Sequence, residues 1–376
     1  MGSIGSERKT SSGAHGEPGL QVVFGTGPVG CAAAELLLEK GLPVRMVNRT
    51  GKRPAGSFLD LGPGLKPALE FVSADAMKKD SVISAAQGAT HIYHCVNVQY
   101  QDWEKKLPIM HANIVRAATE SGAVLAAAEN LYMYARGLDI IDDTARVDPP
   151  SRKGRLIQRL HESLVEAGVR DRLRWTVVRA SDFYGPGSTE QSLFGTVRFL
   201  DPLFAGKRPL LWGNIDLAHT FTYVGDYGRA LATAGLSPEA YGSAWIVPND
   251  RTVTTRAIAE LFFRAAGFTN SHMPRVQRIP RAGFAFVGLF NPLIHEVLEV
   301  LYQKEEPYVV DGGRFRKTFG FEPTPLEEGV RRTLEWYQAT RKTAGASMRR
   351  PGQGSAVGGQ ERGEEALSSA GGEGLL

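Results

Sequence analysis

Residues 20–48 read LQVVFGTGPVGCAAAELLLEKGLPVRMVN, and this stretch decides the fold. A short apolar run at 21–24 indicates a buried strand, and the glycine-rich segment GTGPVG follows directly at 25–30. Residues 28–40 carry apolar side chains on one helical face, and 44–47 is again a short apolar run. The order predicts strand, glycine turn, helix and strand, which is the first unit of a parallel α/β sheet.

The three glycines of this turn have separate physical roles. Gly25 allows a tight turn, Gly27 lets the backbone approach a pyrophosphate, and Gly30 allows the helix to pack closely on the strand. The first N–H groups of the following helix, together with its dipole, attract a phosphate. Strand, turn and helix in this order therefore predict a dinucleotide site in preference to a purely structural turn.

The end of the second strand distinguishes the two nicotinamide dinucleotides. Proteins that bind NAD usually have an acidic residue there to hold the ribose 2′-hydroxyl, whereas this chain has Asn48, Arg49 and Thr50. Arg49 can pair with a 2′-phosphate through its charged N–H groups. We therefore predict NADP, with NAD as the alternative cofactor and a solvated basic loop as the alternative role for Arg49.

Short apolar runs continue to alternate with helical patterns along the chain. Further strands are expected at 69–73, 91–96, 124–128 and 175–178, and helices at 109–121 and 154–167. The alternation fades after residue 188, although 221–234 and 244–247 are expected to return to the main sheet. The predicted fold class is α/β, a Rossmann doubly wound parallel sheet with a smaller C-terminal substrate lobe. The expected divisions are a disordered tail at 1–19, a dinucleotide-binding domain at 20–187, the lobe at 188–341 and a second disordered tail at 342–376.

Composition narrows the class of protein. The chain has 376 residues, 42% hydrophobic and 22% charged, and its net charge of +4 comes from scattered basic residues, so no nucleic-acid partner is expected. Two cysteines without a metal-binding neighbour fit a reducing, cytoplasmic location. Polar residues interrupt the apolar stretch at 282–301, so it is not expected to span a membrane. The first six residues, MGSIGS, match the short N-myristoylation pattern, and a disordered Gly/Ser tail is the alternative.

The chain resembles the NAD(P)-dependent epimerase/dehydratase branch of the short-chain dehydrogenase/reductase superfamily, in its extended or atypical forms. Besides the glycine turn, the resemblance rests on Tyr134 after the strand at 124–128, on RASDFYGP at 179–186 and on FTYVGD at 221–226. It covers roughly 21–337. It implies hydride transfer at a carbinol or carbonyl carbon of a small molecule, with a tyrosine as acid/base and a lysine that lowers its pKa. By analogy it also implies a homodimer.

The sequence departs from that family where the YxxxK motif should begin a helix. Ser151 stands at the tyrosine position and Arg155 at the lysine position, and Asn130 lies near the place of the usual strand-end serine. Tyr132, Tyr134 and Lys153 are the nearest substitutes, while a packing or surface role stays open for each. No metal site is expected, because His91, His94 and His111 lack a ligand spacing.

Two sets of candidate site residues follow from these patterns. The candidate catalytic residues are Asn130, Tyr132, Tyr134 and Lys153. The candidate cofactor-binding residues are Gly25, Thr26, Gly27, Pro28, Val29, Gly30, Asn48, Arg49, Asp75, Cys95 and Asn97. Asp75 is placed to accept a hydrogen bond from the adenine amino group, and Cys95 and Asn97 to pass beside the inner ribose, although a turn and a buried strand end would look the same.

The functional prediction is an NADP-dependent oxidoreductase or epimerase-like enzyme that acts on a hydroxyl or keto group of a small, apolar metabolite. Because the usual acid/base pair is missing, a redox-neutral isomerisation or dehydration on the same scaffold stays open. The alternative from another class is a non-catalytic NADP-binding redox sensor, for which the crevice beside the nicotinamide would be filled.

Overall fold

We describe a computed structural model of the chain that covers residues 19–54, 69–188, 192–269, 276–279, 281–290 and 292–348. Its central sheet has seven strands in the order β11-β6-β5-β4-β1-β2-β3, and all neighbouring strands are parallel. The strands are β1 (Leu20–Phe24), β2 (Val44–Asn48), β3 (Leu69–Ser73), β4 (Ala89–His94), β5 (Val124–Asn130), β6 (Trp175–Ala180) and β11 (Ser243–Ile246). The strand order reverses between β1 and β4, and ligands of such sheets bind at the carboxyl ends of the strands beside this point. The predicted Rossmann fold is confirmed.

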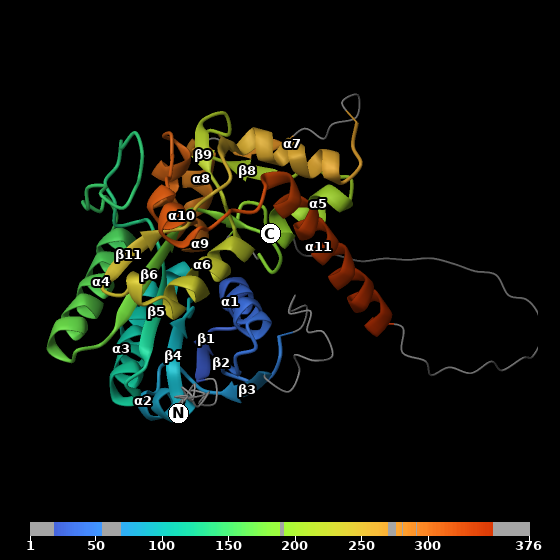
Figure 1. Ribbon diagram of the computed structural model, residues 1–376. Coiled ribbons are helices and arrows are strands. Elements are labelled where there is room, and N and C mark those ends of the chain that lie inside the picture. Colours follow the sequence, from blue (N-terminus) through green and yellow to red (C-terminus); the bar gives the residue numbers. More distant parts are fainter. Residues whose placement is uncertain are drawn as a thin grey trace, which may run out of the picture.

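Helices cover both faces of the sheet (Figure 1). One face packs against α1 (Pro28–Glu39) and α6 (Val224–Leu236), and the other packs against α2 (Lys79–Ala85), α3 (Trp103–Ser121) and α4 (Arg152–Arg170). Successive strand residues point to opposite faces. In β1, for example, Val23 lies in the core on the α1 side and Val22 in the core on the α3 side. This double burial explains why the strands read as continuous apolar runs.

Two helices differ from the sequence expectation. α3 begins at Trp103 and keeps Pro108 inside it, whereas we predicted that the helix starts after this proline. Trp103 and Leu107 are buried, so their packing holds the first turn in place even though Pro108 lacks the N–H for one helical hydrogen bond. The short helix α2 was not predicted, because it has only two buried side chains, Val82 and Ala85.

Most of the elements after β6 build the second lobe, which lies above the sheet in Figure 1, whereas α6 and β11 return to the sheet. Its strands form pairs: β7 (Phe183–Tyr184) with β10 (Thr222–Tyr223), β8 (Leu210–Trp212) with β13 (Gln277–Ile279), and β9 (Ala218–Thr220) with β12 (Thr252–Thr254). Its α-helices are α5 (Asp201–Phe204), α7 (Thr255–Ala265), α8 (Arg281–Gly288), α9 (Pro292–Leu298), α10 (Gly313–Phe319) and α11 (Leu326–Met348), and its short turns of helix include η6 (Leu301–Lys304). A cluster of stacked rings that includes Phe194, Phe199 and Phe262 forms its core.

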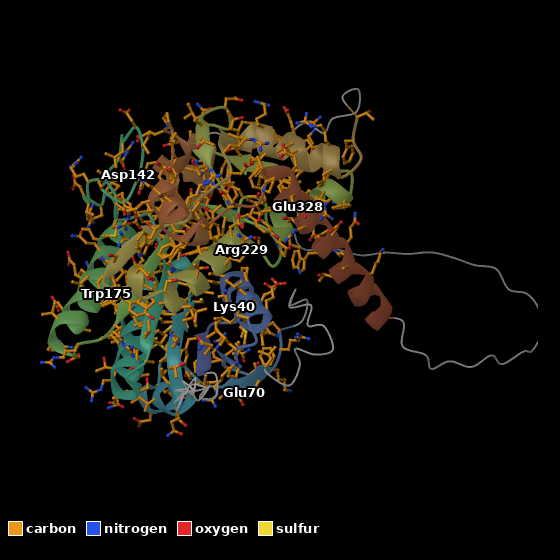
Figure 2. The ribbon with its side chains drawn as sticks, viewed as in Figure 1. Lys40, Glu70, Asp142, Trp175, Arg229 and Glu328 are labelled. Carbon is orange, nitrogen blue, oxygen red and sulfur yellow. The ribbon has the colours of Figure 1, made fainter. Side chains whose placement is uncertain are left out.

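The FTYVGD segment joins the lobe to the sheet. Asp226, in the first turn of α6, accepts hydrogen bonds from the Thr324 backbone N–H and hydroxyl, both at 2.7 Å. Arg229, one turn later, lies over the Phe321 ring at 4.7 Å and donates to the Glu322 carbonyl oxygen. Figure 2 labels Arg229 on α6 and Glu328 on α11 near this junction. The motif therefore has an anchoring role in this chain.

The chain ends differ partly from expectation. α11 continues to Met348, past the position at which the C-terminal tail was expected to begin. The N-terminal myristoylation pattern lies outside the described residues. In the part of the chain that the structure describes, no helix is both long and apolar enough to cross a membrane.

Candidate active site

The glycine turn between β1 and α1 has the backbone that its sequence predicts. Gly25 has a φ of +103°, and a Cβ there would lie 2.5 Å from the Cys95 carbonyl oxygen. A Cβ on Gly30 would run into the Gly25 carbonyl oxygen. A Cβ on Gly27, in contrast, would meet nothing within 4 Å, so this glycine borders open space at the start of α1.

The start of α1 fits a pyrophosphate. Gly27 is its N-cap, no side chain caps the helix, and Pro28 supplies the first helical residue. The N–H groups of this first turn point toward the open space beside Gly27, where an anion would be attracted by the helix dipole. Thr26 and Val29 complete the turn, and the Thr26 hydroxyl accepts a hydrogen bond from the Asn48 side chain at 3.2 Å.

Asn48 and Arg49, at the end of β2, differ in whether their side chains are already hydrogen-bonded within the protein. Asn48 is engaged locally, because its Oδ1 accepts from the backbone N–H groups of Thr50 and Gly51 at 2.9 and 2.8 Å. Arg49 is exposed, and its side chain has no hydrogen-bond or ion-pair partner among the described residues. Asn48 therefore shapes the turn, and the Arg49 guanidinium is available to a ligand.

The other candidate cofactor residues also follow strand ends. Asp75, after β3, accepts a hydrogen bond from the Met77 N–H at 3.0 Å and so stabilises a turn. Cys95 continues β4, where its N–H donates to the Phe24 carbonyl oxygen at 2.8 Å, and burial raises the pKa of its thiol. Asn97 is exposed two residues later. These positions lie along the same edge of the sheet as the glycine turn.

Ser151 and Arg155 stand at the tyrosine and lysine positions of the YxxxK motif, at the start of α4. Ser151 is buried and is the N-cap of α4, where its hydroxyl accepts from the Gly154 N–H at 2.9 Å. Arg155 is exposed on the same helix. A serine in this role stabilises the helix end.

Lys153 is buried and paired. Its Nζ contacts the carboxylates of Glu296, by a short hydrogen bond, and of Glu299 at 2.8 Å, and its backbone N–H donates to Glu299 as well. The same Nζ lies 5.4 Å from the centre of the Tyr100 ring. Lys153 therefore ties the start of α4 to the segment around α9 in the second lobe.

Tyr132 forms a pair of phenols with Tyr100, a residue that the sequence analysis did not single out. The two hydroxyl oxygens are 2.6 Å apart. Burial raises the pKa of Tyr100 to about 12 and that of Tyr132 well above 10, so both phenols stay protonated at neutral pH. Only one of the two hydroxyl hydrogens can lie in the hydrogen bond between the phenols. The other hydrogen has no acceptor among the described residues.

Asn130 lies at the end of β5, beside this pair. Its Oδ1 accepts from the Tyr132 backbone N–H at 3.0 Å, and its Nδ2 has no acceptor within the described ranges. The structure thus brings Asn130, Tyr132 and Lys153 together, as the sequence analysis expected of a site, and adds Tyr100.

Tyr134 lies elsewhere, in a buried ionic network. Its hydroxyl accepts a hydrogen bond from Arg179 at 2.8 Å, and Arg179 also pairs with Glu129 at 3.0 Å across neighbouring strands. Burial raises the pKa of the Tyr134 phenol, and the Arg179 charge only partly opposes this. Burial alone would raise the pKa of Glu129 as well, but Arg179 and His161 together lower it to about 2.

A second cluster escaped the sequence analysis. Asp182, just past the end of β6, contacts His219 of β9 at 2.8 Å and Lys304 of η6. The signal in the sequence was weak, since Asp182 is one polar residue within RASDFYGP. No group of three or more potential metal ligands occurs within the described ranges.

Comparisons with known proteins agree with this architecture. The model of the NAD dependent epimerase/dehydratase family matches residues 22–246. The chain belongs to this family. The part outside the match includes most of the helices of the second lobe.

A curated relative matches over 334 residues at 22% identity. It is an Arabidopsis thaliana protein named 3beta-hydroxysteroid-dehydrogenase/decarboxylase isoform 2, and the match covers 78% of this chain and 56% of the relative. The chain therefore spans little more than half the length of that relative.

Solved structures with the same fold include two epimerase/dehydratase enzymes. The UDP-glucose 4-epimerase of Thermus thermophilus in complex with NAD has a TM-score of 0.65 at 20% identity, covering 85% of this chain and 99% of that one. The dTDP-glucose 4,6-dehydratase of Streptomyces venezuelae has a TM-score of 0.67 at 16% identity, covering 86% and 98%. At these identities the likeness extends to the fold alone.

Proposed function

We propose that this chain is an NADP(H)-dependent oxidoreductase that reduces a keto group, or oxidises the matching hydroxyl group, of an apolar small molecule. The observation that carries the proposal is the Tyr100–Tyr132 phenol pair. It has an unused hydroxyl hydrogen, lies at the carboxyl end of the sheet, and stands beside the start of α4. The family membership supports a nicotinamide cofactor at the same edge.

The exposed Arg49 supports NADP over NAD. A ribose 2′-phosphate carries a charge that an arginine fork binds well, and no acidic residue stands at the end of β2 to hold a 2′-hydroxyl. The expected result is tighter binding of NADPH than of NADH, measured by fluorescence titration. Arg49→Ala should weaken NADPH binding about tenfold and leave NADH binding unchanged. Arg208→Ala, an exposed arginine of the second lobe, is the matched control.

The phenol pair supports the reductive direction at neutral pH. The glycine turn of Gly25, Gly27 and Gly30, together with Arg49, would hold NADPH, which would supply the hydride for the carbonyl carbon. Tyr132 donates its hydroxyl proton to the carbonyl oxygen, Tyr100 donates its proton in turn to the Tyr132 phenolate, and solvent restores the proton of Tyr100. The Nδ2 group of Asn130 donates a hydrogen bond to the same carbonyl oxygen. Since the pKa values of both phenols are raised, both are protonated at neutral pH, so they can donate a proton but cannot accept one as a base.

Hydroxysteroids and ketosteroids are the substrate class to test first. The name of the curated relative supports this choice, and the match covers most of this chain. The sugar nucleotides of the structural neighbours are the alternative class.

The test is consumption of NADPH, followed at 340 nm, with a panel of 3-ketosteroids. Tyr132→Phe should lower kcat about 100-fold, because general acid catalysis contributes at least that factor, while the Kd of NADPH stays the same. Tyr241→Phe is the matched control, since that phenol donates to the Gly235 carbonyl oxygen at the opposite end of the sheet. Turnover that is lost in Tyr134→Phe and kept in Tyr132→Phe would transfer the role of acid to Tyr134.

A second candidate is an NADP-binding sensor without catalytic activity. The observation in its favour is that Ser151, at the tyrosine position of the family's YxxxK motif, caps a helix, and that Lys153, the substitute lysine, is held by two carboxylates. NADPH binding without turnover of any ketone would favour this candidate. Conversion of a substrate without net loss of NADPH would instead favour a redox-neutral reaction.

A further inference from the structure

Asp182, His219 and Lys304 form a cluster of ionisable side chains that the proposed acid does not use. The Asp182 Oδ2 atom lies 2.8 Å from the His219 Nε2 atom and accepts a short hydrogen bond from the Lys304 ammonium group. The His219 Nε2 and Lys304 Nζ atoms are themselves 3.1 Å apart. The three residues come from the end of β6, from β9 and from η6, so they join the sheet to the second lobe.

The two oxygens of the Asp182 carboxylate are in different situations. Both partners contact Oδ2, whereas Oδ1 has no hydrogen-bond partner among the described residues. The side chains of His219 and Lys304 are 3% and 9% exposed, but that of Asp182 is 29% exposed. One oxygen is therefore held firmly, and the other is an unpaired acceptor on a carboxylate that is partly exposed.

Four phenols surround this carboxylate. The negative charge of Asp182 contributes to the raised pKa values of Tyr100 and Tyr132, from the sheet side, and of Tyr302 and Tyr308, from the second lobe. The Tyr302 hydroxyl is buried and has no hydrogen-bond partner in the described part of the chain. Tyr302 and Tyr308 also line a small cavity between the loop after β5 and η6. The charge of the open acceptor thus reaches the proposed proton donor.

Charge decides what this acceptor can bind. Lys304 neutralises Asp182, while burial and the Lys304 charge lower the pKa of His219 to about 4, so the cluster has no net charge at neutral pH. A cationic ligand gains little electrostatic attraction from a cluster without net charge. An anionic oxygen has no hydrogen to donate to the Oδ1 atom. A neutral hydroxyl group matches the site best. Asp182 itself does not act as a base, because Lys304 and His219 hold its pKa below the usual range in spite of burial.

We propose that Asp182 determines specificity by accepting, through Oδ1, a hydrogen bond from a neutral hydroxyl group of the ligand, with Lys304 and His219 as the residues that position it. This inference rests on the proposed function and narrows its substrate class. The site would take apolar alcohols and would discriminate against their phosphate esters.

The experiment measures binding and not turnover. Cyclohexanol and a 3β-hydroxysteroid, the two matching ketones and the two matching phosphate esters are titrated by ligand-observed NMR, each with the cofactor form that does not react with it. The wild-type protein should bind each alcohol at least about tenfold more tightly than its phosphate ester. Asp182→Asn should lower the ratio of alcohol to ketone affinity about tenfold, because an acceptor oxygen is replaced in part by a donor. Asp216→Asn, in the same lobe and paired with Arg256, should keep the wild-type ratio.

An unchanged ratio in Asp182→Asn would overturn the inference, and so would a wild-type protein that binds neither alcohol. Since Asp182→Asn leaves Lys304 buried without a counter-ion, the double variant Asp182→Asn/Lys304→Met is measured beside it, and the same loss of preference is expected. The two proposals can be told apart. An alcohol preference that depends on Asp182, without NADPH consumption, rejects the oxidoreductase alone, whereas turnover with an unchanged ratio rejects the role of Asp182 alone.

Discussion

The β1–α1 turn and the β5–α4 connection lie at the same edge of the sheet, but they hold their chemistry in different ways. The first uses backbone: Gly25 and Gly30 let other backbone atoms come closer than a Cβ would allow, and Gly27 leaves open space at the start of α1. The second uses side chains: Ser151, at the family's tyrosine position, caps α4, while Lys153, two residues before the lysine position held by Arg155, is paired with carboxylates. A site made of backbone is constrained by sterics, while a site made of side chains can be replaced one residue at a time. The following predictions test that contrast.

The largest effect is expected from Gly25→Ala. Its φ of +103° is unfavourable for alanine, and the new Cβ would lie 2.5 Å from the Cys95 carbonyl oxygen. Strain and overpacking together should lower the free energy of unfolding by about 4 kcal/mol, measured by urea denaturation, and abolish NADPH binding.

Gly27→Ala is the matched variant for that experiment. Its Cβ meets nothing within 4 Å, and its φ of −73° suits alanine, so stability should stay within about 0.5 kcal/mol of the wild type. NADPH binding should nevertheless weaken, because the methyl group enters the space beside the start of α1. Unchanged NADPH affinity in Gly27→Ala would contradict the assignment of this turn to the pyrophosphate.

An intermediate effect is expected from Glu129→Gln, which tests the ionic network around Arg179. The pKa of Glu129 is lowered from 4.5 to about 2, so the stabilisation is present above pH 4.5 and is lost as the pH falls toward 2. The shift corresponds to about 3 kcal/mol. The difference in unfolding free energy between wild type and Glu129→Gln, measured in urea at several pH values, should therefore be large at pH 7 and should shrink between pH 4.5 and 2.

Glu120→Gln is the control for that series. Glu120 pairs with Arg116 on the surface of α3, where both side chains are at least one third exposed. Exposed pairs of this kind contribute little, so its difference from wild type should stay below about 0.5 kcal/mol at every pH. A Glu129→Gln difference that does not vary with pH would show that the carboxylate is not ionised in the network.

The smallest effect is expected from Ser151→Ala. Loss of the hydrogen bond from the Gly154 N–H to the Ser151 hydroxyl should cost about 1 kcal/mol of stability, as at other helix N-caps. Turnover at saturating substrate should not change, because Ser151 only shapes the start of α4. A large loss of kcat in a folded Ser151→Ala protein would mean that this hydroxyl takes part in the chemistry.

The sequence by itself determined the Rossmann fold class, its first strand-turn-helix-strand unit and the glycine turn. These features depend on local patterns, since apolar periodicity reports burial and a glycine reports missing space. It also placed Tyr132, Asn130 and Lys153 near the carboxyl ends of the strands, because these ends meet at one edge of a parallel sheet whatever the order of the strands is.

Only the tertiary structure decided what each of these side chains does. Lys153 finds its carboxylates 143 and 146 positions away, and Asp182 finds Lys304 at a distance of 122 positions. Tyr132 pairs with Tyr100, and the pair is left with one hydrogen to donate, while Tyr134, two residues on, is bound by Arg179. Nothing local distinguishes these two tyrosines, because the hydrogen-bond partner, and hence the availability of the proton, is supplied by segments that folding brings together.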